Sequence, residues 1–276
     1  MKPFKVSMVV APPQARFEAV VRESLEDALR ILHDIGFDGV EISILDPPDP
    51  AELRGVTGKY GLEVPALSTG LNYIHYGLSL TSPDPARREK AVERLIEIGR
   101  LGEALGGAGV IIGLMRGRLS EGVGRDEAYR LLVENTRRVA EGCARYGVDV
   151  FFEPLNRYET ELVNTVEEGL RLLEDVGADN LYLLLDTFHM NIEEPVIEDS
   201  IRAARGRIGH FHVADSNRLA PGMGHLDFAS ILHALWDTGY RRYLSAEIIV
   251  KPDLEAAART TYNTLLRAME GLGGPE

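Results

Sequence analysis

The sequence predicts a single α/β domain folded as a closed barrel of eight parallel strands, with a helix after each strand. Eight short apolar runs alternate with longer amphipathic segments along the 276 residues. The runs are almost continuously apolar, which is typical of parallel strands covered by helices on one face and by the barrel interior on the other. No linker, low-complexity run or block of charge divides the chain.

The eight runs give the expected strands in chain order. The first, "FKVSMVV", lies close to the N-terminus, and the sixth, "LYLLLD", runs from apolar residues into an aspartate. By residue number, the strands are expected at 4–10, 38–42, 63–69, 109–114, 149–154, 181–186, 208–215 and 243–249.

The segments between these runs have helical periodicity and helical stop signals. In residues 85–105, leucine and isoleucine recur at steps of three and four. Thr165 and Glu168 have the spacing of a capping box, so we expect Glu168 to cap a helix and not to bind a ligand. Several helices end in a glycine just before the next strand, which is the expected C-terminal stop: Gly36, Gly147, Gly177 and Gly239.

A doubly wound α/β sheet is the rival fold. Such a sheet would carry a Gly-rich phosphate-binding turn after its first strand, and none follows residues 4–10. The stretch "GGAGVIIG" contains glycines, but it precedes a strand and does not join a strand to a helix. We therefore predict a (β/α)8, or TIM, barrel over residues 1–270, followed by a flexible tail at 271–276.

Composition narrows the classes of function. The formal net charge of −13 argues against binding to nucleic acid or to an anionic membrane surface. The longest apolar runs are far too short to span a bilayer, and the N-terminus resembles a first strand and not a signal peptide. The lone Cys143 excludes an internal disulfide and lies within a predicted helix, where packing is its expected role. We expect a cytoplasmic protein without a nucleic-acid or membrane partner.

Polar residues stand at the ends of the last four expected strands, where barrels of this kind place their chemistry. Any one of them alone is best explained as a helix cap or an ion-pair member. Neighbouring strands lie about 5 Å apart, so four consecutive ends can converge, and three converging carboxylates repel one another unless a cation joins them. Three oxygen donors and one imidazole suit Mn²⁺, Mg²⁺ or Co²⁺ better than a structural Zn²⁺. These four residues, called the strand-end quartet below, are Glu153, Asp186, His212 and Glu247.

Four stretches around the quartet resemble the D-tagatose 3-epimerase family of xylose-isomerase-like barrels. They are "FFEPLNRYET", "LLLDTFHMNIEE", "HFHVADSNRLAPGMGHLDF" and "SAEII". The resemblance spans residues 148–250, with the motifs in the family's order. The N-terminal half matches the family only in its alternation of strands and helices.

The resemblance implies the chemistry of a keto-sugar 3-epimerase. The quartet would bind the metal, with Mn²⁺ as the expected ion, and Glu153 and Glu247 would double as the acid–base pair. Glu159, His189 and Arg218 would contact substrate oxygens. Removing a proton next to the carbonyl and returning one on the other face gives the epimer, and the cation stabilises the enediolate. The resemblance also implies a homodimer or homotetramer.

Two features depart from the family pattern and bear on the substrate. The end of the first strand, "VVAPPQARFEA", has two prolines and lacks the Trp or Tyr that family members acting on neutral ketoses tend to carry. Arg116 and Arg118 follow the fourth strand, and arginine matches a carboxylate bidentately. We therefore expect Arg116 to bind the acid group of a keto sugar acid of the 5-keto-gluconate type. A solvated loop or an ion pair between subunits is the alternative role for this arginine.

Three other functions remain open at this point. An aldose–ketose or hydroxypyruvate-type isomerase would use the same metal site and differ only in where the proton returns. A nuclease like the endonuclease IV relatives of this barrel would need more histidine ligands and a basic groove, which the charge of −13 disfavours. A binding protein without catalysis is permitted by the fold but leaves the full set of site residues unexplained.

Overall fold

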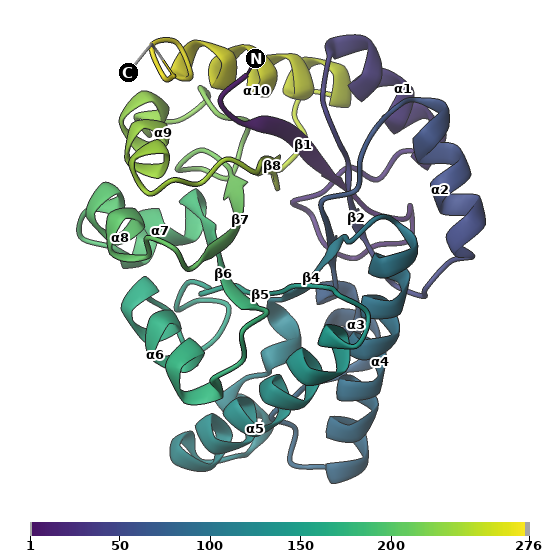
Figure 1. The fold of residues 1–276 in the computed structure, drawn as a ribbon, viewed down its shortest axis with the longest axis vertical. Helices are drawn as coiled ribbons and strands as arrows, with labels where there is room; N and C mark the ends of the chain where they lie inside the picture. The colour runs from purple at the N-terminus through teal and green to yellow at the C-terminus, as the bar shows by residue number, and fades with distance from the viewer. Residues whose placement is uncertain (1, 274–276) are drawn as a thin grey trace.

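The barrel is closed and built from eight parallel strands in chain order (Figure 1). The computed structural model describes residues 2–273. β8 pairs with β1, with Tyr243 opposite Lys5, which closes the ring. The strands are β1 (Lys5–Val10), β2 (Glu41–Ser43), β3 (Ala66–Ser68), β4 (Gly109–Ile112), β5 (Val150–Phe152), β6 (Leu181–Asp186), β7 (Ile208–Val213) and β8 (Tyr243–Ala246). All eight predicted strands are confirmed.

Helices surround the strands as an outer ring (Figure 1). They are α1 (Leu25–Ile35), α2 (Pro50–Lys59), α3 (Gly70–Tyr76), α4 (Pro85–Ala104), α5 (Arg125–Ala144), α6 (Val166–Val176), α7 (Thr187–Glu193), α8 (Ile197–Ala203), α9 (Phe228–Asp237) and α10 (Leu254–Ala268). Two short 3₁₀ turns, at Leu114–Arg116 and Leu119–Glu121, follow β4. The sequence analysis did not predict these two turns.

The predicted start and stop signals operate as expected. Thr165 accepts from the Glu168 backbone N–H, and the Glu168 side chain accepts in return, so the capping box of α6 is confirmed. Gly177 ends that helix with φ +68°, a left-handed conformation that only glycine adopts without strain. Cys143 is buried in the core, as its position in a helix predicted.

Apolar side chains fill the half of the barrel interior that lies toward the amino ends of the strands. Phe151 forms a buried cluster there with Ala66, Ile111 and Leu184. A Cβ atom at Gly109 would lie 2.1 Å from the Phe151 ring, so glycine is what lets the ring fill this space. Since side chains alternate along a strand, the next inward position on each strand lies nearer the carboxyl end, where the interior becomes polar.

Part of the predicted C-terminal tail is described, and in it Leu272 packs against the core. The rest of the predicted tail, residues 274–276, lies outside the described residues. Within residues 2–273, no helix combines the length and apolarity needed to cross a membrane.

Candidate active site

The structure brings the whole strand-end quartet together at the carboxyl end of the barrel. Glu153 and Glu247 directly follow β5 and β8, Asp186 ends β6, and His212 lies in β7 opposite Asp186. Each residue offers one donor atom, and these four atoms lie within 4.8 Å of one another. All four side chains are buried.

Donor atoms of the quartet point at the same space without a protein partner. Glu153 Oε1, Asp186 Oδ2 and His212 Nδ1 are buried and accept no hydrogen bond from the described residues. His212 Nδ1 lies 3.7 Å from Glu153 Oε1 and 3.9 Å from Asp186 Oδ2. Buried polar atoms without partners are costly, and converging carboxylates repel one another. A divalent cation would satisfy all of them, and the oxygen-rich donor set fits Mn²⁺, Mg²⁺ or Co²⁺.

His189 faces the same space but is oriented as a hydrogen-bond donor. Asn156 directs its backbone N–H (3.4 Å) and its side-chain amide (2.7 Å) at His189 Nδ1. Burial and the nearby Arg218 charge hold the pKa of His189 well below its ordinary value, so the ring is neutral. Because Nδ1 accepts, the single ring proton belongs on Nε2. That N–H lies 3.8 Å from Glu153 Oε1 and has no partner among residues 2–273, so it is free to donate to a ligand.

Arg218 is clamped between two of the predicted site carboxylates. Its Nη1 donates to Glu159 Oε1 at 2.8 Å and its Nη2 to Glu247 Oε2 at 2.7 Å. The guanidinium also lies over the rings of Phe188 (4.8 Å) and Phe17 (5.2 Å). Arg218 itself has a left-handed backbone, with φ +61°, an unusual conformation for a bulky residue. This strained turn after β7 aims the side chain into the site.

Burial raises the pKa of every carboxyl group in the quartet. The effect is largest for Glu153, where the charge of Glu247 adds to burial and the pKa is raised well above its ordinary value. For Asp186 and Glu247, the Arg218 guanidinium opposes burial, and the pKa is raised less. The two glutamates therefore differ: Glu247 is held closer to its ionised form and Glu153 closer to its protonated form.

Cation binding is expected to strengthen with pH. Burial opposes protonation of His212, but the Glu41 carboxylate and the other acidic groups overcome it and raise the pKa to about 10. Folded-state pKa values above the unfolded ones stabilise the cation-free protein at low pH, and this contribution is lost as pH rises. A cation must displace those protons, so its affinity should rise about tenfold per pH unit for each proton released. Mn²⁺ titration calorimetry across neutral pH measures this, and a pH-independent affinity would contradict it.

The prediction that Arg116 binds a substrate acid group is wrong. The 3₁₀ turn after β4 directs this side chain into the protein, where it is fully buried. Its guanidinium lies over the Phe152 ring, 4.2 Å from the centroid. Because Arg116 is fully buried, it also cannot lie in a solvated loop or form an ion pair with another subunit. The acceptors of its N–H groups are the backbone carbonyls of Ile112, Gly113, Leu162 and Val163.

Arg116 instead fixes the loop that carries Glu159, and its loss should destabilise the fold. Arg116→Met leaves several buried carbonyls without donors, so we expect the free energy of unfolding to fall by about 3 kcal/mol. Urea denaturation measures the change. Arg145→Met, at an exposed position just after α5, is the control and should cost under about 0.5 kcal/mol. Equal stability of the two variants would contradict this role.

Two site residues escaped the sequence-based prediction. Phe17 comes from the "VVAPPQARFEA" segment and lines the cavity, so this segment does supply an aromatic ring despite lacking Trp and Tyr. Glu41 of β2 is fully buried and hydrogen-bonded to His212. The signal for Glu41 was present as a lone carboxylate within the apolar run "DGVEI", whereas nothing in the sequence placed Phe17 opposite Arg218. His210 of β7 is also buried in the barrel interior, and its Nε2 lies 2.8 Å from Glu41 Oε2.

Comparison with known proteins agrees with this geometry. The family model described as xylose isomerase-like TIM barrel matches residues 29–268. The L-ribulose 3-epimerase of Mesorhizobium japonicum is 39% identical over 231 residues, which are 82% of this chain and 76% of that protein. The 3-dehydro-D-guloside 4-epimerase of Escherichia coli is 28% identical, over 87% of this chain and 93% of its own.

A solved structure of an L-ribulose 3-epimerase superimposes with a TM-score of 0.81 and 32% identity, covering 95% of this chain and 94% of the other. The family-model match over residues 29–268 includes all four strands that carry the quartet. The chain belongs to the xylose isomerase-like TIM barrel family, and its resemblance to the ketose 3-epimerases within that family is confirmed.

Proposed function

We propose that this enzyme is a metal-dependent 3-epimerase of ketoses. The observation that carries the proposal is the convergence of buried, unpartnered donor atoms from Glu153, Asp186 and His212, with Glu247 beside them. The chain's similarity to a protein named L-ribulose 3-epimerase supports the same reaction. When bound, the cation would supply a Lewis acid that polarises the substrate carbonyl and acidifies the neighbouring C–H.

Glu153 and Glu247 are the proton carriers. One removes the proton from C3 and the other, in its protonated form, returns a proton to the opposite face, so the pair ends with its protons exchanged. Arg218 holds Glu247 toward the ionised form at 2.7 Å, which suits this residue to act as the base in one direction. Glu153 has no such ion pair and starts as the acid. The reverse reaction exchanges the roles.

His189 and Arg218 position and stabilise the substrate oxygens. The free Nε2–H of His189 can donate to an oxygen that gains negative charge as the C3 proton leaves. Glu159 is held by Arg218 and by Asn156, whose side-chain amide lies 3.2 Å from Glu159 Oε1. A carboxylate held in this way can accept from a sugar hydroxyl.

A neutral ketose fits the site better than a keto sugar acid. Among the described residues lining the cavity, Arg218 is the one arginine, and its two Nη groups are already paired with carboxylates. The buried Arg116 cannot serve the acid group for which it was predicted. We expect turnover of a neutral ketose to exceed that of the matching keto sugar acid by about 10-fold or more, as for a charge left without a partner. A strong preference for the acid would contradict this choice of substrate.

A screen of ketoses with Mn²⁺, read by product NMR in deuterated water, tests the reaction itself. A 3-epimerase gives deuterium at C3 and no aldose product. The alternative isomerase returns the proton at the former carbonyl carbon and yields an aldose. Loss of turnover on chelation, restored by Mn²⁺, separates either enzyme from a non-catalytic barrel.

The proposal includes Mn²⁺ as the native ion, a homodimer or homotetramer, and a cytoplasmic location. The donor chemistry of the quartet supports Mn²⁺, and the resemblance to the ketose 3-epimerases supports the assembly. The lone, buried Cys143 is compatible with a reducing compartment. Metal analysis of the purified protein and light scattering measure the ion and the number of copies.

A further inference from the structure

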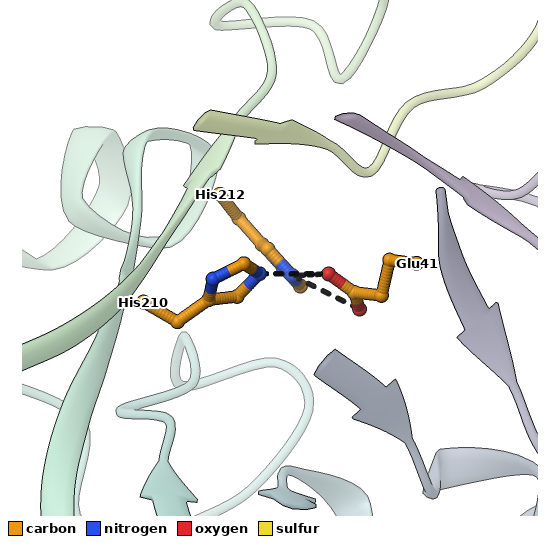
Figure 2. A group of neighbouring side chains, drawn as sticks. All are labelled: Glu41, His210 and His212. Atoms are coloured by element: carbon orange, nitrogen blue, oxygen red, sulfur yellow. Dashed lines mark hydrogen bonds and ion pairs between the residues drawn. The ribbon is translucent and has the colours of Figure 1, made fainter. Parts of the chain in front are cut away.

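A second group of buried polar side chains lies one layer deeper in the barrel than the quartet. It consists of Glu41 at the start of β2 and of His210 and His212 in β7 (Figure 2). The exposed fractions are 0%, 2% and 1%, so water does not satisfy these groups. Figure 2 shows both imidazole rings pointing from β7 toward the Glu41 carboxylate. Only His212 belongs to both this group and the quartet.

The contacts of Glu41 have hydrogen-bond geometry. Its Oε2 lies 2.8 Å from His210 Nε2 and 3.0 Å from His212 Nε2, and its Oε1 lies 3.2 Å from His212 Nε2. The hydroxyl of Ser68 donates to the same carboxylate. An ionised carboxylate only accepts, so both Nε2 atoms must carry hydrogens. Every donor directed at Glu41 is thereby paired.

This pairing decides which nitrogen of His212 can bind a cation. A cation that binds at Nδ1 would displace the second proton of His212, and the neutral ring would then carry one proton, which Glu41 requires on Nε2. The lone pair is then left on Nδ1, the atom that has no partner and lies 3.7 Å from Glu153 Oε1. His210 in turn restrains Glu41, and its ring is stacked on Phe151 with centroids 5.6 Å apart and planes 14° apart.

We infer that Glu41 is a positioning residue that fixes the ring orientation and the Nε2–H tautomer of His212, so that Nδ1 presents its lone pair to the cation. The inference rests on the proposed metal-dependent function. Carboxylates that accept from the second nitrogen of a metal-binding histidine raise its basicity and lock its orientation. Here the carboxylate comes from β2, outside the four consecutive strands, β5 to β8, that carry the quartet.

A second cation between Glu41 and the two histidines is the competing explanation. It would require both Nε2 atoms to lose their protons and the His212 ring to bridge two cations. Glu41 Oε2 already contacts both nitrogens at hydrogen-bond distance, which the proton arrangement explains without a further ion. The number of cations bound per chain separates the two explanations.

Glu41→Gln is the test, with Mn²⁺ binding to the full chain measured by calorimetry. The wild type is expected to bind one Mn²⁺ per chain. In the variant, the amide removes the charge and turns a donor toward a ring N–H, so we expect the dissociation constant for Mn²⁺ to rise about 10- to 100-fold. Glu63→Gln is the matched control, because Glu63 is an exposed partner of Lys5 outside the site, and its Mn²⁺ affinity should equal that of the wild type. Unchanged affinity in a folded Glu41→Gln variant would overturn the inference, as would two ions per wild-type chain falling to one in the variant.

Imidazole ¹⁵N NMR of the Mg²⁺-loaded wild type keeps the inference falsifiable where the variant does not fold. We expect the spectrum to show His212 as the Nε2–H tautomer, with this proton directed at Glu41. A spectrum that shows the Nδ1–H tautomer would overturn the inference. Both measurements are made without substrate. A protein that binds one cation but epimerises no ketose therefore contradicts the proposed function alone, whereas a wild type that binds no cation contradicts both.

Discussion

Replacing either Glu153 or Glu247 by glutamine is expected to lower kcat for ketose epimerisation by about 10³-fold, within the range that general acid–base catalysis contributes. Glutamine keeps one oxygen near the cation position but can neither take up nor release the C3 proton. Stopped assays of product by NMR at saturating Mn²⁺ measure the chemical step apart from weaker metal binding. Because epimerisation requires both the removal and the return of a proton, the double variant should be little worse than either single one.

Proton exchange and a control variant test this prediction further. Each single variant should exchange the C3 proton of only one of the two epimers with solvent, because the remaining carboxylate still faces one side of C3. Glu63→Gln, at an exposed position near the other end of the barrel, should retain wild-type kcat. Retention of more than about a tenth of the wild-type kcat in Glu153→Gln or Glu247→Gln would exclude that residue as a proton carrier.

The barrel and the quartet were predictable because each left a regular mark in the sequence. Parallel strands buried on both faces produce runs such as "LYLLLD", and the helix stops at Gly36 and Gly177 mark where the next strand approaches. The quartet could be predicted from the same strand pattern, because consecutive strand ends must meet at one edge of a closed barrel. Asp186 and His212 are in fact direct neighbours across β6 and β7.

The failures lie where the backbone leaves regular structure or where a side chain crosses the barrel. Arg116 sits in a 3₁₀ turn, and the direction of its side chain depends on which carbonyls the later loop at Leu162 and Val163 presents. That contact joins residues 46 positions apart, which no local pattern encodes. Glu41 was overlooked because its partners lie on β7, 169 or more residues away. A lone glutamate in an apolar run signals a buried partner but does not name it.

The most direct test of the central claim is Mn²⁺ binding to two neighbouring variants, Asp186→Asn and His189→Ala. Asp186 Oδ2 is one of the unpartnered atoms that face the proposed cation, whereas His189 is outside the quartet and directs an N–H into the same space. We expect calorimetry to give one Mn²⁺ per wild-type chain. Since even an outer partner of a metal ligand is worth about 10- to 100-fold in affinity, loss of a direct ligand should weaken binding by about 100-fold or more.

His189→Ala should keep Mn²⁺ affinity within a few-fold of the wild type while kcat falls by about 10²-fold, the value of one hydrogen-bond donor to a developing oxyanion. This pair of results would place Asp186 in the metal site and His189 on the substrate. Wild-type Mn²⁺ affinity in Asp186→Asn, or no Mn²⁺ binding by the wild type, would contradict a cation site built from the four strand ends.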